Sequence, residues 1–307
     1  MKQLLLFVII LVAVNIALSF YFYKVSVRNH KLYKQDRVFH SSEDQIDLLV
    51  MGHSRPFRAI DETQFDNIVN FCSGGESNVH TYYKLKYVLE QSGKNVETVI
   101  LPAGFGSFNL DDPSLISNSF YWKKYVDYLE LSEVSNDFST YTSIWLKSKV
   151  IPWYEYPYLK LSLETGDFDL KISKEKYQNG SAEEKYKMAR MILDRAVANS
   201  QFYDSVSSIY LNKTIELCKN SDCKLVFVKY PVTSSYKKAM NEIVDEKELS
   251  ELAIRIEEII DKEGITLLDH QDMWLENDDH FLDPQHLNED GKKAFSKLLK
   301  SEIARLD

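Results

Sequence analysis

The sequence predicts an α/β domain of three layers, in which a parallel sheet of five strands lies between two layers of helices. Five short apolar runs, rich in β-branched residues and without strict alternation, are typical of strands buried on both faces of a parallel sheet. Helical patterns separate the later runs, and this order favours a three-layer α/β domain. The runs are QIDLLVMG (45–52), IVNF (68–71), VETVILP (96–102), KLVFVKYP (224–231) and ITLLD (265–269).

Glycines and apolar spacing place three helices around these strands. One is expected over residues 77–91, ended by Gly93, and another over 247–263, where Gly264 stands at the C-terminal cap position. An amphipathic helix closes the chain, with apolar residues on one face at Phe295, Leu298, Leu299, Ile303 and Leu306.

Residues 110–200 interrupt the strand–helix rhythm and are rich in Tyr, Trp, Lys and Glu. We expect a largely helical insertion between the third and fourth strands. A long helix begins near residue 181, where Ser181 and Glu184 have the spacing of a capping box. The aromatic side chains either line a substrate groove or pack the insertion onto the core.

Length and charge limit the class of protein. The 307 residues suit one large domain or one domain with an insertion. The net charge of −9 argues against binding to nucleic-acid phosphates, so no nucleic-acid partner is expected. Cys218 and Cys223 flank a short turn. The sequence is compatible with a disulfide between them and with two unpaired thiols.

The N-terminal residues 4–22 are apolar and uncharged, and they are long enough to span a bilayer as one helix. A cleaved signal peptide is the alternative, since Ala17-Leu18-Ser19 offers a small-x-small site. The uncleaved anchor is favoured because the apolar stretch is long for a signal sequence. We therefore expect an anchor or signal over 1–23, a juxtamembrane linker over 24–44 and a domain over 45–307.

Ligands of open parallel sheets bind outside the carboxyl ends of the strands, and chemically useful residues follow several of the predicted strands. Ser54 comes directly after the first strand, where Gly52 allows a tight turn. The second strand is followed by CSGGES, in which Gly75 permits close approach of backbone N–H groups to an oxyanion. Asn109, after the third strand, is a candidate side-chain donor.

The stretch FLDPQHLNEDG before the last helix places Asp283 three residues ahead of His286. A serine hydroxyl is a weak nucleophile and needs a base within hydrogen-bond reach, which His286 would supply. Asp283 would fix the imidazole tautomer and stabilise the imidazolium. The sequence therefore predicts a triad of Ser54, His286 and Asp283, with an oxyanion hole formed by Ser54, Gly75 and Asn109.

These blocks resemble the SGNH/GDSL-type hydrolases over about residues 45–110 and 222–305. DPQHLN (283–288) matches the C-terminal Asp-x-x-His block closely, while MGHSRPFRAID and SGGES resemble the Ser and Gly blocks. His53 stands where many members have Asp, and GFGSFN lacks the usual Gly-x-Asn spacing of the Asn block. The resemblance implies a flavodoxin-like sheet and serine-dependent acyl chemistry without a cofactor or metal.

With its N-terminal anchor, the chain resembles the bacterial cell-envelope branch of that superfamily, which includes alginate O-acetylation proteins and DltD-like proteins. The resemblance implies O-acyl transfer on a polysaccharide or other envelope polymer, beside a membrane-bound acyltransferase partner. It also implies a domain on the extracytoplasmic side of the membrane. The positive-inside rule points the other way, because five basic residues follow the span and Lys2 alone precedes it.

Three alternatives remain open at the level of sequence. Simple ester hydrolysis needs the same triad as acyl transfer. A non-catalytic scaffold or glycan-binding module is favoured by the missing GDS triplet and opposed by the intact Ser, Asp and His residues. A metal site is the third alternative, although the spacing of its candidate ligands is irregular. Those candidates are His270, Asp272, Asp278, Asp279, His280, Asp283 and His286.

Overall fold

The computed structural model describes residues 1–28, 30–104, 118–155, 177–197 and 205–306. Contacts within the chain divide it into two units. One unit holds the predicted α/β domain, and the other holds the apolar N-terminal helix together with part of the insertion. Their bounds are Ser42–Ser114 with Phe168–Asp307 for the α/β unit, and Met1–Ser41 with Leu115–Asp167 for the N-terminal unit.

The described residues of the α/β unit form a five-stranded parallel sheet in the order β2-β1-β3-β4-β5. This is the order of a flavodoxin-like doubly wound sheet. All five predicted strands are confirmed, and each end lies within two residues of the prediction. The strands are β1 (Gln45–Val50), β2 (Ile68–Asn70), β3 (Asn95–Pro102), β4 (Lys224–Lys229) and β5 (Thr266–Asp269).

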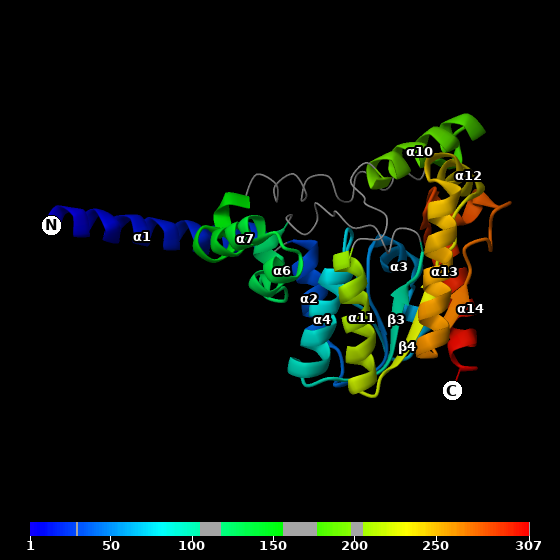
Figure 1. Ribbon diagram of the computed structural model, residues 1–307, viewed down its shortest axis with the longest axis horizontal. Helices are drawn as coiled ribbons and strands as arrows, with labels where there is room; N and C mark the ends of the chain where they lie inside the picture. The colour runs from blue at the N-terminus through cyan, green and yellow to red at the C-terminus, as the bar shows by residue number, and fades with distance from the viewer. Residues whose placement is uncertain (29, 105–117, 156–176, 198–204, 307) are drawn as a thin grey trace. The chain divides into compact units, whose positions relative to one another are not determined.

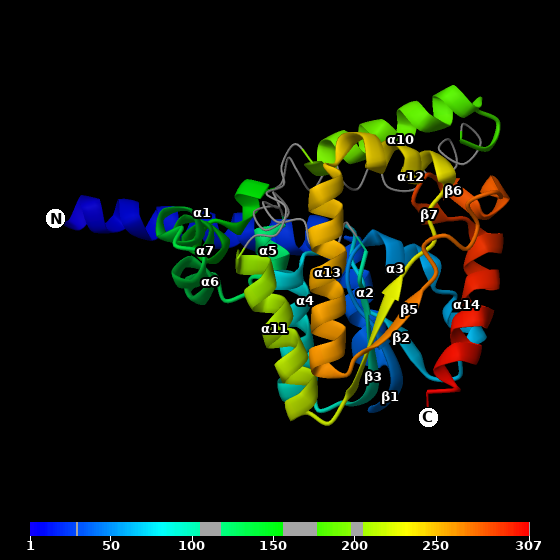
Figure 2. The ribbon, with the colours of Figure 1, turned by 45° about the vertical axis from the view of Figure 1, so that its right-hand side comes forward.

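Helices cover both faces of this sheet, so the predicted three-layer class is confirmed. Figures 1 and 2 show α4, α11 and α13 on one face and α14 on the other. The helices of this unit are α3 (Ser54–Ala59), α4 (Asn78–Gln91), α10 (Ala182–Val197), α11 (Ser205–Asn220), α12 (Ser234–Ile243), α13 (Glu246–Glu263) and α14 (Glu289–Ile303), with short 3-10 turns η2 (Glu62–Gln64) and η6 (Asp278–His280).

The main core lies between the sheet and α14. Successive strand residues point to opposite faces, so alternate positions of β1 and β4 meet this helix. Its fully buried members include Val50, Val226, Val228, Phe295 and Leu299. Because both faces are covered, the later residues of β1 and β3, Leu48–Val50 and Val99–Leu101, are apolar and buried without alternation, which explains the apolar runs in the sequence.

Local signals set the helix ends as predicted. Gly264 ends α13 in the left-handed conformation, with φ +64°. Ser181 and Glu184 form the expected capping box ahead of α10, where the Ser181 N–H donates to the Glu184 carboxylate at 2.8 Å. At the turn between α11 and β4, Cys218 and Cys223 are buried free thiols.

The N-terminal unit is helical in its described residues. Its first helix is apolar enough to cross a membrane over residues 2–25, and it fits either an anchor or a signal sequence. The segment expected to be a linker contains a helix over residues 31–41. The elements are α1 (Lys2–Phe22), the π-helical turn η1 (Tyr23–Val27), α2 (Lys31–Ser41), α5 (Ser119–Trp122), α6 (Tyr128–Val134), α7 (Phe138–Val150) and the 3-10 turn η5 (Pro152–Glu155).

Candidate active site

Ser54 is positioned by a tight turn at the carboxyl end of β1. Gly52 has φ +117°, and a Cβ at this position would lie 2.7 Å from the ring of Pro102 at the end of β3. Glycine is therefore required here, because both the backbone conformation and the contact with Pro102 exclude a side chain. The chain enters α3 directly afterwards, with Ser54 as its first residue.

Asp283 and His286 lie opposite each other in a short antiparallel hairpin. Its strands are β6 (Phe281–Asp283) and β7 (His286–Leu287), and Asp283 pairs with His286 in the register. No strand was predicted at this place, so the hairpin was missed. Thr233 holds the hairpin tip, because its N–H and its hydroxyl both donate to the Pro284 carbonyl, at 3.1 and 3.0 Å.

The structure brings the three predicted triad residues into one hydrogen-bonded relay. His286 Nε2 lies 2.8 Å from Ser54 Oγ, and His286 Nδ1 lies 2.8 Å from Asp283 Oδ2. Asp283 uses its other oxygen to accept the backbone N–H groups of Gln285 and His286, at 3.0 and 3.1 Å. With Nδ1–H donating to the carboxylate, Nε2 accepts the serine proton, as nucleophile activation requires.

Electrostatics keep the carboxylate of this relay ionised. Burial acts to raise the pKa of Asp283, but His286, the Gln285 N–H and Arg58 outweigh it and hold that pKa below its usual value. The side chains of Asp283 and His286 are 18% and 12% exposed. The relay is therefore largely shielded from water, while a small part of both side chains remains exposed to solvent.

His53, which stands where many SGNH/GDSL-type members have Asp, caps a helix. Its Nδ1 accepts the N–H of Arg55 at 3.3 Å, which satisfies one of the free donors at the start of α3. Burial first, and then Arg55 and His286, lower the pKa of His53 to about 3. The ring is therefore neutral near pH 7, and its proton lies on Nε2.

The Gly block after β2 lies beside the Ser block. The Ser73 N–H donates to the Gly52 carbonyl at 2.9 Å, which joins the two loops. Gly75 has φ +72°, which favours glycine at this position. Among the described residues, no oxygen accepts the N–H of Ser54 or of Gly75, so both groups suit the predicted role of oxyanion donor.

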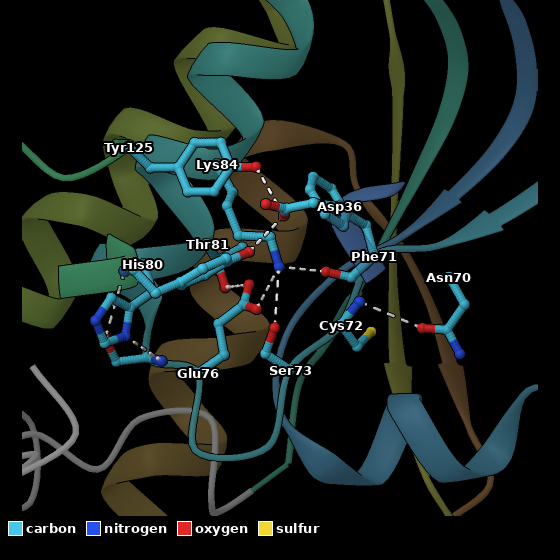
Figure 3. Close-up of polar contacts among 12 residues, drawn as sticks. Asp36, Asn70, Phe71, Cys72, Ser73, Glu76, His80, Thr81, Lys84 and Tyr125 are labelled. Atoms are coloured by element: carbon cyan, nitrogen blue, oxygen red, sulfur yellow. Dashed lines mark hydrogen bonds and ion pairs between the residues drawn. The ribbon is translucent and has the colours of Figure 1, made fainter. Parts of the chain in front are cut away.

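A buried ion pair supports this loop, and sequence reasoning missed it. Lys84 on α4 lies 2.8 Å from Glu76, and both side chains are fully buried. The ammonium group also donates to the Phe71 carbonyl and to the Ser73 hydroxyl, so its three protons have three acceptors (Figure 3). The loop from 71 to 76 is therefore bound to one helix.

The carboxylate of this pair has a second partner. The Thr81 hydroxyl donates to the free oxygen of Glu76 at 2.8 Å. Burial raises the pKa of Glu76 even though Lys84, Thr81 and Ser73 act to lower it. The single clue in the sequence is a charged residue on the buried face of α4, next to a loop with two glycines.

The remaining predictions for the site concern Asn109 and a metal site. Asn109 lies outside the described residues, so its role as oxyanion donor stays a prediction. Within the described ranges, no three His, Cys, Asp or Glu side chains gather as a metal site. Two histidines of the acidic segment have carboxylate partners instead: His270 lies 2.8 Å from Glu302, and His286 pairs with Asp283.

A family model matches residues 158–306, just under half of the chain. No curated protein matches the sequence. Two solved structures from Bacteroides are similar: a "putative acylhydrolase" of B. fragilis, with 10% identity and TM-score 0.46, and a GDSL-like lipase of B. thetaiotaomicron, with 11% identity and TM-score 0.45. The alignments cover 91% of this chain and 97% and 98% of those chains.

Identities near 10% carry no information on the reaction, and the sheet order itself establishes the fold class. The membrane-anchored branch of the superfamily stays a prediction.

Proposed function

We propose that the chain is an SGNH-type serine esterase or O-acyltransferase that uses Ser54, His286 and Asp283. The observation that carries the proposal is the pair of 2.8 Å contacts from His286, one to Ser54 and one to Asp283, at the carboxyl edge of the sheet. Three residues from two distant parts of the chain meet there in the order that nucleophile activation needs.

The reaction would proceed in two steps. Ser54 Oγ attacks the ester carbonyl while His286 Nε2 takes its proton, and the N–H groups of Ser54 and Gly75 bind the oxyanion. His286 then gives that proton to the leaving alcohol, and an acyl-serine remains. In the second step His286 takes a proton from water or from a sugar hydroxyl, whose oxygen attacks the acyl group, and His286 then returns that proton to Ser54 Oγ as the serine leaves. Water yields an acid, and a hydroxyl acceptor yields a new ester.

The proposed setting is the bacterial cell envelope. The apolar helix α1 supports a single-pass anchor, and we place the α/β unit on the extracytoplasmic side. There it would act on O-acetyl groups of a polysaccharide or other envelope polymer, with a membrane-bound acyltransferase as the partner that supplies the acyl group. Co-purification with such a partner, followed by detection of acyl transfer to polymer, tests this setting.

A fluorophosphonate probe tests the activated serine. The full chain, purified in detergent, is labelled and mapped by mass spectrometry, and we expect the adduct on Ser54. Ser54→Ala and His286→Gln should each abolish the adduct, while a thermal melt shows that both variants are folded. If the folded wild-type chain forms no adduct, the catalytic proposal is wrong and a glycan-binding role takes its place.

A further inference from the structure

Arg55, the residue after the proposed nucleophile, is a buried cation. The residue is 7% exposed. The guanidinium donates from Nε and Nη2 to Gln285 Oε1, at 3.4 and 3.1 Å, and from Nη2 to the Tyr236 hydroxyl. It also lies 4.9 Å from the centre of the Tyr236 ring. All of these partners are neutral.

Among the described residues, no carboxylate forms an ion pair with Arg55. A buried charge is costly unless it is paired, and a neutral amide and a phenol offset that cost only in part. The one carboxylate of the triad, Asp283, already interacts with His286 and with Arg58. Among the described residues, the surroundings of Ser54 thus hold Arg55 and Arg58 with one ionised carboxylate, that of Asp283, in a chain of net charge −9.

The third guanidinium nitrogen, Nη1, lies near Gly104, two residues after the end of β3 at the carboxyl edge of the sheet. A Cβ on Gly104 would approach Arg55 Nη1 to 3.2 Å, so this nitrogen lies against the backbone that leaves β3. No oxygen of a described residue accepts a hydrogen bond from Nη1. Gln285, which holds the other two nitrogens, is next to His286 in the hairpin.

We propose that Arg55 forms an anion subsite beside Ser54, which takes a carboxylate or phosphate group carried by the ester or by the acyl acceptor. The inference rests on the function proposed above, and it names the chemical class of substrate. The planar fork of arginine matches both groups and binds them through two parallel hydrogen bonds. The bound anion would supply the counter-ion that the described residues do not provide.

The rival interpretation is a clamp without a ligand. Arg55 follows the nucleophile, and Gln285 precedes the base, so their hydrogen bonds also tie the two loops together across 230 positions. Such a clamp would support turnover of every ester alike, whereas an anion subsite would favour charged esters over neutral ones. Substrate preference therefore separates the two roles.

The first experiment compares two esters on the full chain in detergent. We measure kcat/KM for mono-4-nitrophenyl succinate, which carries a carboxylate, and for neutral 4-nitrophenyl acetate. The ratio of the two values cancels any general loss of activity or of folded protein. We expect Arg55→Gln to lower this ratio about tenfold or more, the size of a charge-assisted hydrogen bond, and Arg55→Lys to keep part of it. Equal losses on both esters, or a lysine variant no better than glutamine, would overturn the subsite.

The second experiment does not need turnover. Thermal melts of Ser54→Ala are recorded in sodium chloride, sodium acetate and sodium phosphate at equal ionic strength, with and without the added Arg55→Gln change. We expect acetate or phosphate to raise Tm by about 2 °C or more, and the larger rise identifies the preferred anion. The rise should vanish with Arg55→Gln. The same rise in both proteins, or none in either, would overturn the subsite even if the serine labels normally.

Discussion

Two ion pairs with the same 2.8 Å separation lie near the carboxyl edge of the sheet, and they differ in exposure. Asp283 and His286 are 18% and 12% exposed, whereas Glu76 and Lys84 are fully buried. The open pair leaves His286 Nε2 for Ser54, while every proton of the Lys84 ammonium group is taken by the loop around it. Because the partly exposed pair leaves His286 Nε2 available, it can exchange a proton with a substrate. The fully buried pair has all of its protons hydrogen-bonded within the loop, so it can only stabilise that loop.

This difference predicts opposite consequences for mutations in the two pairs. A change in the open pair should remove activity and leave the fold intact. A change in the sealed pair should lower the free energy of unfolding first, because an unpaired buried charge remains.

The largest effect is expected from Asp283→Asn in the open pair. Asparagine keeps the shape and can still accept the backbone N–H groups of the hairpin, but it no longer holds His286 in the tautomer that accepts the Ser54 proton. We expect kcat on 4-nitrophenyl acetate to fall about 10⁴-fold, with Tm nearly unchanged. A loss smaller than about tenfold would mean that the carboxylate does not orient the base.

The next largest effect is expected from Lys84→Met in the sealed pair. It leaves the Glu76 carboxylate buried without its partner, and we expect the free energy of unfolding to fall by about 3–5 kcal/mol. Denaturant titration measures this loss. Lys86→Met on the same helix, outside the pair, is the matched control and should cost less than about 1 kcal/mol. The double variant Lys84→Met with Glu76→Gln should recover part of the loss; without recovery, the charge is not the cause.

The open pair could be predicted from the sequence and the sealed pair could not, for physical reasons. Asp283 and His286 are three residues apart, and their spacing reflects a local turn. Strands were predictable because burial on both faces demands continuous apolar runs. Lys84 and Glu76 look like ordinary solvated charges, since apolar periodicity treats every lysine as exposed.

Long-range contacts could not be predicted from the sequence either. Nothing in the local pattern indicates that Arg55 meets Gln285, because their hydrogen bonds depend on how β1 and the hairpin are placed in the fold. The hairpin itself has strands of only three and two residues, too short for a strand signal. The glycine-dependent turn at Gly52 was predicted, and its close approach to Pro102 was not.

A smaller effect, on the pH dependence of stability, is expected from His80, which lies beside the buried pair. His80 is fully buried beside Lys84, and burial first, then that charge, lowers its pKa to about 3 from 6.5. Its Nδ1 accepts the Ser77 N–H at the start of α4. The unfolded chain takes up the proton below about pH 6.5 and the folded chain does not, so the stability that neutral His80 contributes is lost as pH falls from 6.5 towards 3.

We expect the loss due to His80 to approach about 1.4 kcal/mol per pH unit once the pH is well below 6.5. Denaturant titrations at pH 6.5 and 5.5 measure the loss in the wild type and in His80→Gln. Glutamine still accepts the Ser77 N–H as a capping-box residue but does not titrate. Because the unfolded histidine is already half protonated at pH 6.5, the variant should lose about 1 kcal/mol less than the wild type over this interval. Identical losses would mean that His80 is protonated in the folded chain.

The smallest effect is expected at His53, which precedes Ser54 but does not belong to the relay of Ser54, His286 and Asp283. Its Nδ1 is used to accept the Arg55 N–H, and its pKa of about 3 keeps it neutral. His53→Ala should lower stability by about 1 kcal/mol through loss of the helix cap, whereas His53→Asn should cost only a few tenths, because asparagine is a good cap. Both should keep ester turnover within about tenfold of the wild type, far from the Asp283→Asn loss. If both instead lost turnover as fully as Asp283→Asn, His53 would share the role of base, and the relay described here would be incomplete.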